Sequence, residues 1–313
     1  MSEYQFKLGM FLPELDLPAE EALGTARGMG AEYVWFSRLK DMAPVAEWSD
    51  SEVDRIGRLV EQHRLKWLVV SADNPFKDVH LTDLPLEGLA EHPLFQRHLK
   101  VLVRSMQIAQ RLGVAAVYSH ACAWPGEYTA DKPTWPMRWL TRGGLIAETD
   151  LQKLTTALSM VADEAERHGV DVVLGMLPWH YTNTSTNFRQ VAERVGSRRL
   201  RAMWGPCDAT TSGELDVATA GFRNIRPYLH SVHCKDIHIE DGLHRKIQYR
   251  PLGEGMVDYP TLLRQLMDHR CDVVLSVSTH FWPASGSRVE AMQINYANLR
   301  RLISQVQLQQ EQV

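Results

Sequence analysis

Gly169-Val-Asp-Val-Val-Leu-Gly-Met-Leu-Pro-Trp179 is the stretch that decides the fold. Its apolar run, Val170–Leu177, is short and almost unbroken, which is typical of a parallel strand buried on both faces. A helical pattern, Leu151–His168, precedes it, with Thr149 as the candidate capping residue and Gly169 just past its end. The stretch therefore predicts a helix that leads directly into a buried parallel strand.

The same alternation extends along the whole chain. Amphipathic stretches such as Leu94–Leu112, with apolar residues at spacings of three and four, separate short apolar runs. Eight units of this kind predict an α/β fold, a single (β/α)8 TIM barrel over residues 1–313. The expected strands are Phe6–Leu12, Tyr33–Phe36, Lys66–Ser71, Ala115–His120, Val170–Leu177, Leu200–Trp204, Leu229–Lys235 and Asp272–Ser278.

The composition is that of an ordinary soluble protein. The chain has 313 residues, of which 44% are hydrophobic and 23% charged, and its net charge of −4 gives no electrostatic reason to bind nucleic acid. No run approaches ~18 apolar residues and the first residues lack a signal-peptide pattern, so we expect a cytoplasmic protein with no membrane partner. Widely spaced cysteines without a CxxC pair are expected to be free thiols; they are Cys122, Cys207, Cys234 and Cys271.

Two segments depart from the alternating pattern. Ala121–Glu148 follows the fourth expected strand and is rich in Trp and Pro, so we expect a lid over the active face or a contact within a homo-oligomer. Gln305–Val313 is polar and rich in Gln, and we expect a frayed tail there.

Four phrases in order along the chain resemble the sugar phosphate isomerase/epimerase superfamily, the xylose-isomerase-like TIM barrels. Gly169–Trp179 resembles the fifth-strand phrase of that family, and His233-Cys-Lys-Asp236 resembles its seventh-strand His-x-Lys-Asp. Leu252-Gly-Glu-Gly-Met-Val-Asp-Tyr-Pro260 is similar to the Gly-x-Gly turn before the last helix. Leu275-Ser-Val-Ser-Thr-His280 resembles the eighth strand, so the resemblance reinforces the barrel prediction.

The resemblance implies a divalent-metal site that this chain has largely lost. Members of the family usually hold the metal with Glu, Asp, His and Glu on strands five to eight. Only the His is kept, as His233; the other three positions carry Gly175, Gly205 and Ser278. One imidazole cannot replace several converging ligands, so we expect no bound metal and no other cofactor.

Four residues at strand ends are the candidate catalytic groups: His233, His120, Asp208 and Lys235. His120 is expected at the rim as a base or hydrogen-bond partner, although a solvated loop His is the alternative. Asp208 is either a relocated carboxylate base or the N-cap of the turn at Thr210–Thr211. His233 and Lys235 alternate along one strand, so both point the same way.

Lys235 has two interpretations of its own. A buried lysine can act as a base or a Schiff-base amine. The alternative, which we favour here, is that Lys235 pairs with Asp236, Glu254 or Asp258 and only fixes the loop.

Other residues near strand ends are candidate substrate contacts, with packing or surface positions as the alternative. The aromatic rings offer stacking surfaces, and the loss of carboxylates leaves a less charged pocket that could accept a more apolar ligand. These candidates are Trp124, Trp179, His180, Trp204, Gly175, Gly205, Ser278 and His280, and Trp282 is a further aromatic in a loop after the last strand.

The leading hypothesis is an isomerase, epimerase or lyase that moves a proton on a small sugar, polyol or keto substrate without a metal. One alternative is a non-catalytic ligand-binding protein or partner subunit on the same barrel. The other is a metalloenzyme with relocated ligands among His120, Asp208, His233 and His280. Barrel architecture alone does not decide among these.

Overall fold

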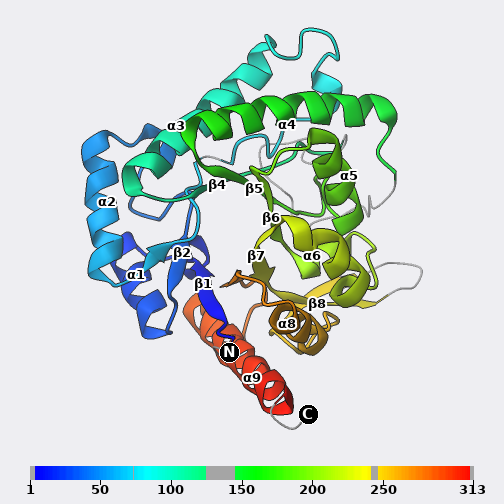
Figure 1. Cartoon of the computed structure of the whole chain (residues 1–313). Coiled ribbons are helices and arrows are strands. Elements are labelled where there is room, and N and C mark those ends of the chain that lie inside the picture. Colours follow the sequence, from blue (N-terminus) through cyan, green and yellow to red (C-terminus); the bar gives the residue numbers. More distant parts are fainter. Residues whose placement is uncertain (1–3, 73, 125–144, 241–245, 311–313) are drawn as a thin grey trace.

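A parallel β-barrel forms the centre of the molecule (Figure 1). The computed structural model describes residues 4–72, 74–124, 145–240 and 246–310, and all statements below concern these. Within them, an eight-stranded sheet has the spatial order β3-β2-β1-β10-β7-β6-β5-β4. Its strands are β1 Lys7–Phe11, β2 Tyr33–Trp35, β3 Lys66–Trp67, β4 Ala116–Ser119, β5 Asp171–Gly175, β6 Leu200–Trp204, β7 Leu229–Cys234 and β10 Val274–Val277.

The ring closes just beyond the short strand β3. Val70 forms a parallel bridge with Val117 of β4, through hydrogen bonds Val70 N to Ala116 O (3.0 Å) and Tyr118 N to Val70 O (2.8 Å). The predicted TIM barrel is therefore confirmed, and all eight expected runs carry a strand of the barrel.

Helices surround the barrel and cover the outer faces of its strands (Figure 1). Most connect consecutive strands, as expected for right-handed strand–helix units. They are α1 Ala19–Gly28, α2 Asp50–Gln62, α3 Pro93–Leu112, α4 Glu148–His168, α5 Ser185–Val195, α6 Pro206–Thr211, α7 Phe222–Ile225, α8 Tyr259–Asp268 and α9 Arg288–Gln310. One-turn helices are η1 Leu12–Leu15, η2 Val45–Glu47, η3 Leu81–Asp83, η4 Val217–Gly221 and η5 Arg226–Tyr228.

Local sequence signals set several of these helix ends. Ser49 and Glu52 form a capping box at the start of α2, and Gly169 ends α4 at a positive φ of 65°. Thr149 is not the cap of α4 as predicted, because the helix already begins at Glu148, after Ala147.

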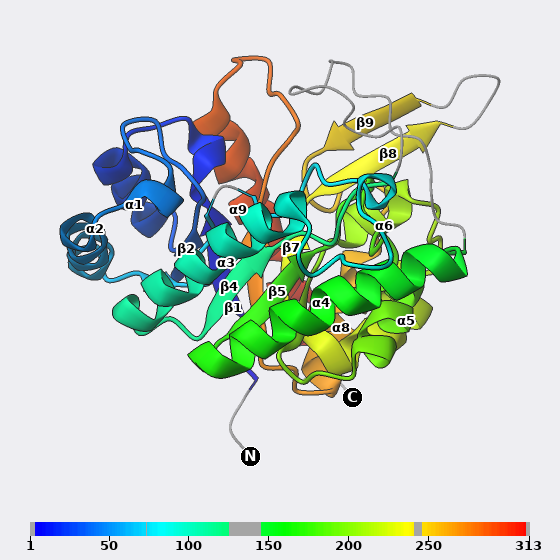
Figure 2. The same ribbon diagram turned by 90° about the horizontal axis from the view of Figure 1, so that it is seen from above.

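A hairpin follows β7 and was not predicted. Its strands, β8 Asp236–Glu240 and β9 Lys246–Arg250, pair with each other in an antiparallel ladder and stand apart from the barrel (Figure 2). The Asp236 carboxylate accepts hydrogen bonds from four backbone amides, those of Ile237, Gly253, Gly255 and Val257, at 2.9–3.1 Å. This cluster fixes the hairpin and the following Gly-x-Gly turn to the end of β7.

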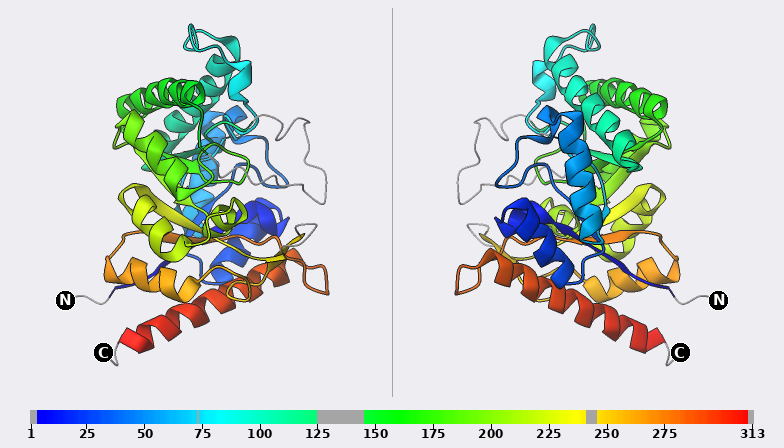
Figure 3. Two further views of the ribbon diagram at one scale, coloured as in Figure 1. Left: turned by 90° about the vertical axis from the view of Figure 1, so that its right-hand side faces the viewer. Right: turned by 90° about the vertical axis from the view of Figure 1, so that its left-hand side faces the viewer.

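The first and last strands of the barrel lie side by side. β1 pairs with β10 from Lys7 opposite Val274 to Met10 opposite Val277. Helix α9 extends along the outside of this junction (Figure 3), and Tyr296 Oη donates a hydrogen bond of 2.6 Å to Gly9 O. The terminal segments therefore complete the barrel together.

The two exceptional segments lie partly outside the described residues. Of Ala121–Glu148, residues 125–144 are not described, so the lid or oligomer contact expected there stays a prediction. The frayed tail expected over Gln305–Val313 also stays a prediction; α9 continues through Gln310, and residues 311–313 are not described. In the described part, no helix combines the length and apolar character needed to cross a bilayer.

Candidate functional site

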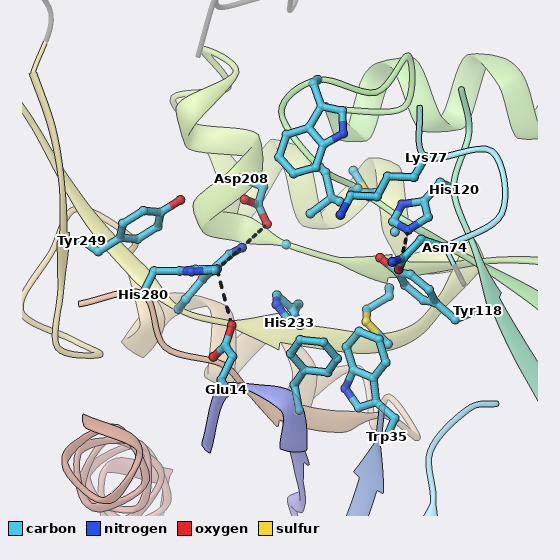
Figure 4. Close-up of a pocket in the computed structure, with 18 residues that line it drawn as sticks. Glu14, Trp35, Asn74, Lys77, Tyr118, His120, Asp208, His233, Tyr249 and His280 are labelled. Atoms are coloured by element: carbon cyan, nitrogen blue, oxygen red, sulfur yellow. Dashed lines mark hydrogen bonds and ion pairs between the residues drawn. The ribbon is translucent and has the colours of Figure 1, made fainter. Parts of the chain in front are cut away.

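A cavity of about 170 Å³ opens at the carboxyl ends of the barrel strands (Figure 4). One part of its wall is aromatic and apolar, formed by Phe11, Trp35, Tyr118, Met176, Leu177, Trp179 and Met203. The polar part carries Glu14, Asn74, Lys77, His120, Asp208, His233, Lys235, Tyr249 and His280, with Gly175 and Gly205 in the lining.

A buried ion pair lies at the polar end of the cavity. Lys235 Nζ is 3.1 Å from Asp208 Oδ2, and the two side chains are only 5% and 3% exposed. Burial alone lowers the pKa of Lys235, but Asp208, Cys207 and Glu14 outweigh it and leave that pKa raised. Lys235 is therefore an ammonium at neutral pH, which does not suit a Schiff-base amine.

This pair corrects two predictions. Lys235 was expected to pair with Asp236, Glu254 or Asp258, but its partner is Asp208. Asp208 lies inside α6, whose N-cap is Gly205, so the capping interpretation is wrong and its carboxylate faces the cavity.

Glu14 was missed by the sequence analysis. It lies in η1, immediately after β1, and accepts hydrogen bonds from Ser278 Oγ (2.7 Å) and from the Thr279 amide. Burial raises its pKa to about 7, although both hydrogen bonds and Lys235 oppose the shift. Its only sequence signal was its place just beyond the first expected strand, where no motif singles out an acid.

His280 connects Glu14 to the ion pair. Its Nε2 atom is 3.5 Å from Glu14 Oε1 and 3.5 Å from Lys235 Nζ. Burial and the nearby Lys235 hold the pKa of His280 well below its usual range, so the ring is neutral. Glu14, His280, Lys235 and Asp208 thus form a continuous polar array on one side of the cavity (Figure 4).

The two glycines at family ligand positions are covered by neighbouring side chains. A Cβ atom on Gly175 would be 2.6 Å from Tyr118 Cζ, and closer still to the hydroxyl. One on Gly205 would be 2.5 Å from Asp208 Oδ2. Tyr118 and Asp208 therefore fill the space through which longer carboxylate side chains would enter.

The described residues do not fit the divalent metal that the fold family implies. Ser278 donates its hydroxyl to Glu14, and Gly175 and Gly205 have no side-chain donors. Among the residues that the structure describes, no three His, Cys, Asp or Glu side chains converge as a ligand set. This includes the relocated set of His120, Asp208, His233 and His280.

His233 lies at the centre of the cavity, between the polar array and the aromatic wall (Figure 4). Its ring packs edge-on against Trp35 at 5.9 Å and Phe11 at 6.4 Å. Burial, reinforced by Lys235, holds the pKa of His233 well below its usual range, and Nδ1 has no hydrogen-bond partner in the described part of the structure. A neutral imidazole therefore lines the site.

His120 lines the opposite side, with Nε2 3.4 Å from Asn74 Oδ1. Its ring packs against that of His180 at 4.7 Å. Burial lowers the pKa of both, that of His180 to about 3, so both rings are neutral. The positive charge of Lys77, a lining residue not singled out from the sequence, also lowers the pKa of both rings, although a hydrogen bond with the Lys77 backbone opposes the shift at His180.

The remaining predicted substrate contacts divide into two groups. Trp179, Gly175, Gly205 and His280 line the cavity with the four catalytic candidates. Trp124, His180, Trp204 and Ser278 do not: Trp124 stacks on Tyr181 at 4.0 Å, and Trp204 packs against Phe222 in the core. Trp282 is 60% exposed, beneath the guanidinium of Arg288.

The fold agrees with the sequence family. A profile described as xylose isomerase-like TIM barrel matches residues 23–295, so the chain belongs to that family. No curated protein matches the chain at a significant level.

Solved structures of similar fold cover nearly the whole chain. A xylose isomerase-like protein from Mycobacterium smegmatis, in complex with magnesium, has a TM-score of 0.67 and 14% identity over 97% of this chain and all of that one. A probable 3-DHS dehydratase from Bacillus anthracis has a TM-score of 0.69 and 15% identity, covering 94% and 99% of the two chains. A D-psicose 3-epimerase from Clostridium cellulolyticum with D-tagatose has a TM-score of 0.68 and 13% identity, covering 95% and 99%. At these identities the similarity establishes the fold alone.

Proposed function

We propose that this protein is an isomerase, epimerase or lyase that moves a proton on a small oxygenated substrate without the divalent metal of its family. The observation that carries the proposal is the array in the cavity: a buried carboxyl with a pKa of about 7 and a buried ammonium, both within 3.5 Å of one His280 nitrogen. A general acid–base group works best when its pKa lies near the operating pH. The epimerase and dehydratase among the structural neighbours perform chemistry of this broad type by name.

Glu14 is the proposed base. Its carboxylate takes a proton from the carbon next to a substrate carbonyl, and the electron pair of the C–H bond forms an enolate. Return of that proton to the former carbonyl carbon, while the adjacent hydroxyl proton passes to the former carbonyl oxygen, gives an isomer. Protonation of the original carbon on its other face by water, while Glu14 releases its proton to solvent, gives an epimer. Loss of a β-hydroxyl group as water gives elimination instead.

The other cavity residues have supporting roles. His233 offers a neutral imidazole in the cavity lining that can exchange a hydrogen bond with a substrate hydroxyl. His120 offers the same from the opposite wall. The rings of Trp35 and Trp179 give the substrate an apolar face to lie against.

The test is incorporation of deuterium from D₂O into candidate substrates, followed by NMR, which detects proton transfer before the product is known. The panel contains D-fructose, D-psicose, D-tagatose and cyclic keto acids, with protein stripped of metal by EDTA. Glu14→Gln should slow exchange by about 10²–10⁴-fold, the usual contribution of a positioned base. Glu20→Gln, on the exposed side of α1, is the matched control.

Three results would contradict the proposal. Unchanged exchange in Glu14→Gln would remove Glu14 from the chemistry. Tight binding of a panel member with no exchange would favour a ligand-binding protein instead. A gain of exchange only after adding Mn²⁺ would favour a metalloenzyme.

A further inference from the structure

We infer that the Lys235 ammonium supplies the fixed positive charge that a divalent cation supplies in other members of this family, and that it binds the oxygen on which the substrate develops negative charge. This inference rests on the proposed function and names the group that would replace the metal. The chain has the barrel of its family, but its described residues do not form a set of metal ligands.

The first observation is how the ligand positions are filled. Asp208 brings a carboxylate over Gly205, so an acidic group still reaches the cavity at that strand end. Its partner there is Lys235 at 3.1 Å. Over Gly175 lies the Tyr118 hydroxyl, and beside Ser278 lies Glu14. Asp208 and Glu14 thus bring carboxylates close to an ammonium group from positions other than those of the family's ligands.

The second observation is the burial of this ammonium. The Lys235 side chain is 5% exposed and still lines the cavity. A charge held in a site that excludes water acts more strongly on a ligand than it would in solvent, and a pre-positioned charge costs no reorganisation during the reaction. An ammonium has three donors; Asp208 and His280 lie within reach of two, which leaves one for a ligand oxygen.

The third observation is the balance of charge. Before proton transfer the array contains Lys235 as a cation and Asp208 and Glu14 as carboxylates. When Glu14 takes the substrate proton it becomes neutral, and the negative charge moves to the substrate oxygen. The net charge of the site stays the same, so one ammonium is enough to hold the new oxyanion.

The experiment measures binding of oxalate, a small planar dianion that resembles an enolate, by calorimetry on EDTA-treated protein. Lys235→Met should weaken binding by about tenfold or more, whereas Lys235→Arg, which keeps the charge, should keep part of it. Lys40→Met is the control, because Lys40 is 60% exposed and pairs with Asp16 outside the cavity. Added Mg²⁺ should leave the wild-type affinity for free oxalate unchanged, once the oxalate bound in the magnesium complex is subtracted.

A second variant tests whether Lys235→Met loses oxalate binding only because it folds poorly. Lys235→Met leaves the buried Asp208 without its partner, so Lys235→Met combined with Asp208→Asn removes both charges at similar volume. It too should lose oxalate binding. Equal binding by either variant, no binding by the wild type, or binding that appears only with added metal would overturn the inference.

The deuterium assay separates the two proposals. Exchange that persists in Lys235→Met would refute the role of Lys235 and leave the proposed function standing. If oxalate binding depends on Lys235 but the protein shows no exchange, the role of Lys235 would stand and the proposed function would be refuted.

Discussion

The surroundings of the Glu14 carboxyl group disfavour its ionised form. The side chain is largely buried, and burial raises its pKa from 4.5 to about 7 against the effect of Ser278, Thr279 and Lys235. The folded protein therefore binds a proton at Glu14 more tightly than the unfolded chain does. A raised acid pKa makes folding less favourable as pH rises through the window between the two values.

The pH dependence of stability follows from this shift. Between about pH 4.5 and 7 the wild type should lose about 3 kcal/mol of unfolding free energy relative to Glu14→Gln, because the neutral amide does not ionise. Urea unfolding of both proteins at several pH values measures the difference. A constant difference across the window would show that Glu14 has an ordinary pKa in the folded state.

The Tyr118 side chain occupies the space that a side chain on Gly175 would need, so substitutions at the two positions should affect stability together. Gly175→Ala should cost about 1–3 kcal/mol, the usual penalty of overpacking, because its Cβ would be 2.6 Å from Tyr118 Cζ. In the double variant with Tyr118→Ala the two costs should be less than additive, since the clash is gone. Gly28→Ala is the control, as nothing lies within 4 Å of its Cβ. Additive costs in urea unfolding would contradict this coupling.

At the scale of elements, the β8–β9 hairpin forms part of the site although it lies outside the barrel. It carries Tyr249, which lines the cavity and packs against His280 at 4.8 Å between ring centres. The hairpin keeps this position because Asp236 binds four backbone amides around it. A single carboxylate therefore holds one wall of the cavity in place.

Asp236→Ala should destabilise the β8–β9 hairpin and the following Gly-x-Gly turn more than the loss of an ordinary helix cap would. Removing the acceptor leaves amides of Gly253, Gly255 and Val257 without a partner, at about 1–3 kcal/mol for each that stays buried. Hydrogen exchange at these amides should accelerate. Asp258→Ala, which removes the N-cap of α8, should cost about 1 kcal/mol and leave those amides protected. Equal protection in both variants would show that Asp236 does not hold the turn.

The sequence predicted the elements unevenly, for physical reasons. Barrel strands such as Val170–Leu177 were clear, because burial on both faces produces continuous apolar runs. The hairpin was missed because its strands are half-exposed and so lack a continuous apolar run, although the alternation of Ile237 and Ile239 with polar residues was a usable signal. Helix α9 continues into the polar stretch after Gln305, where the sequence analysis expected a frayed tail. Leu302 and Val306 are still buried in its last turns.

At the scale of the whole molecule, the predicted site and the observed cavity overlap but differ in their chemistry. His233, His120, Asp208 and Lys235 come together because strand ends meet at one rim of a barrel, which spacing along the chain can predict. The partners of those residues could not be predicted in the same way. Glu14, more than 200 residues from Lys235 in the chain, reaches it through His280 only when the ring is closed.

The pairing of β1 with β10 has a consequence for how the protein is made. Strand β1 (residues 7–11) is synthesised well before β10 (residues 274–277), the strand that hydrogen-bonds to one of its edges. Until those residues emerge, the growing chain carries an unpaired strand edge, which is a template for wrong association. Contacts between such distant parts of a chain also form slowly. Closure of the barrel, and with it the meeting of Glu14 with Ser278, is therefore a late event in folding.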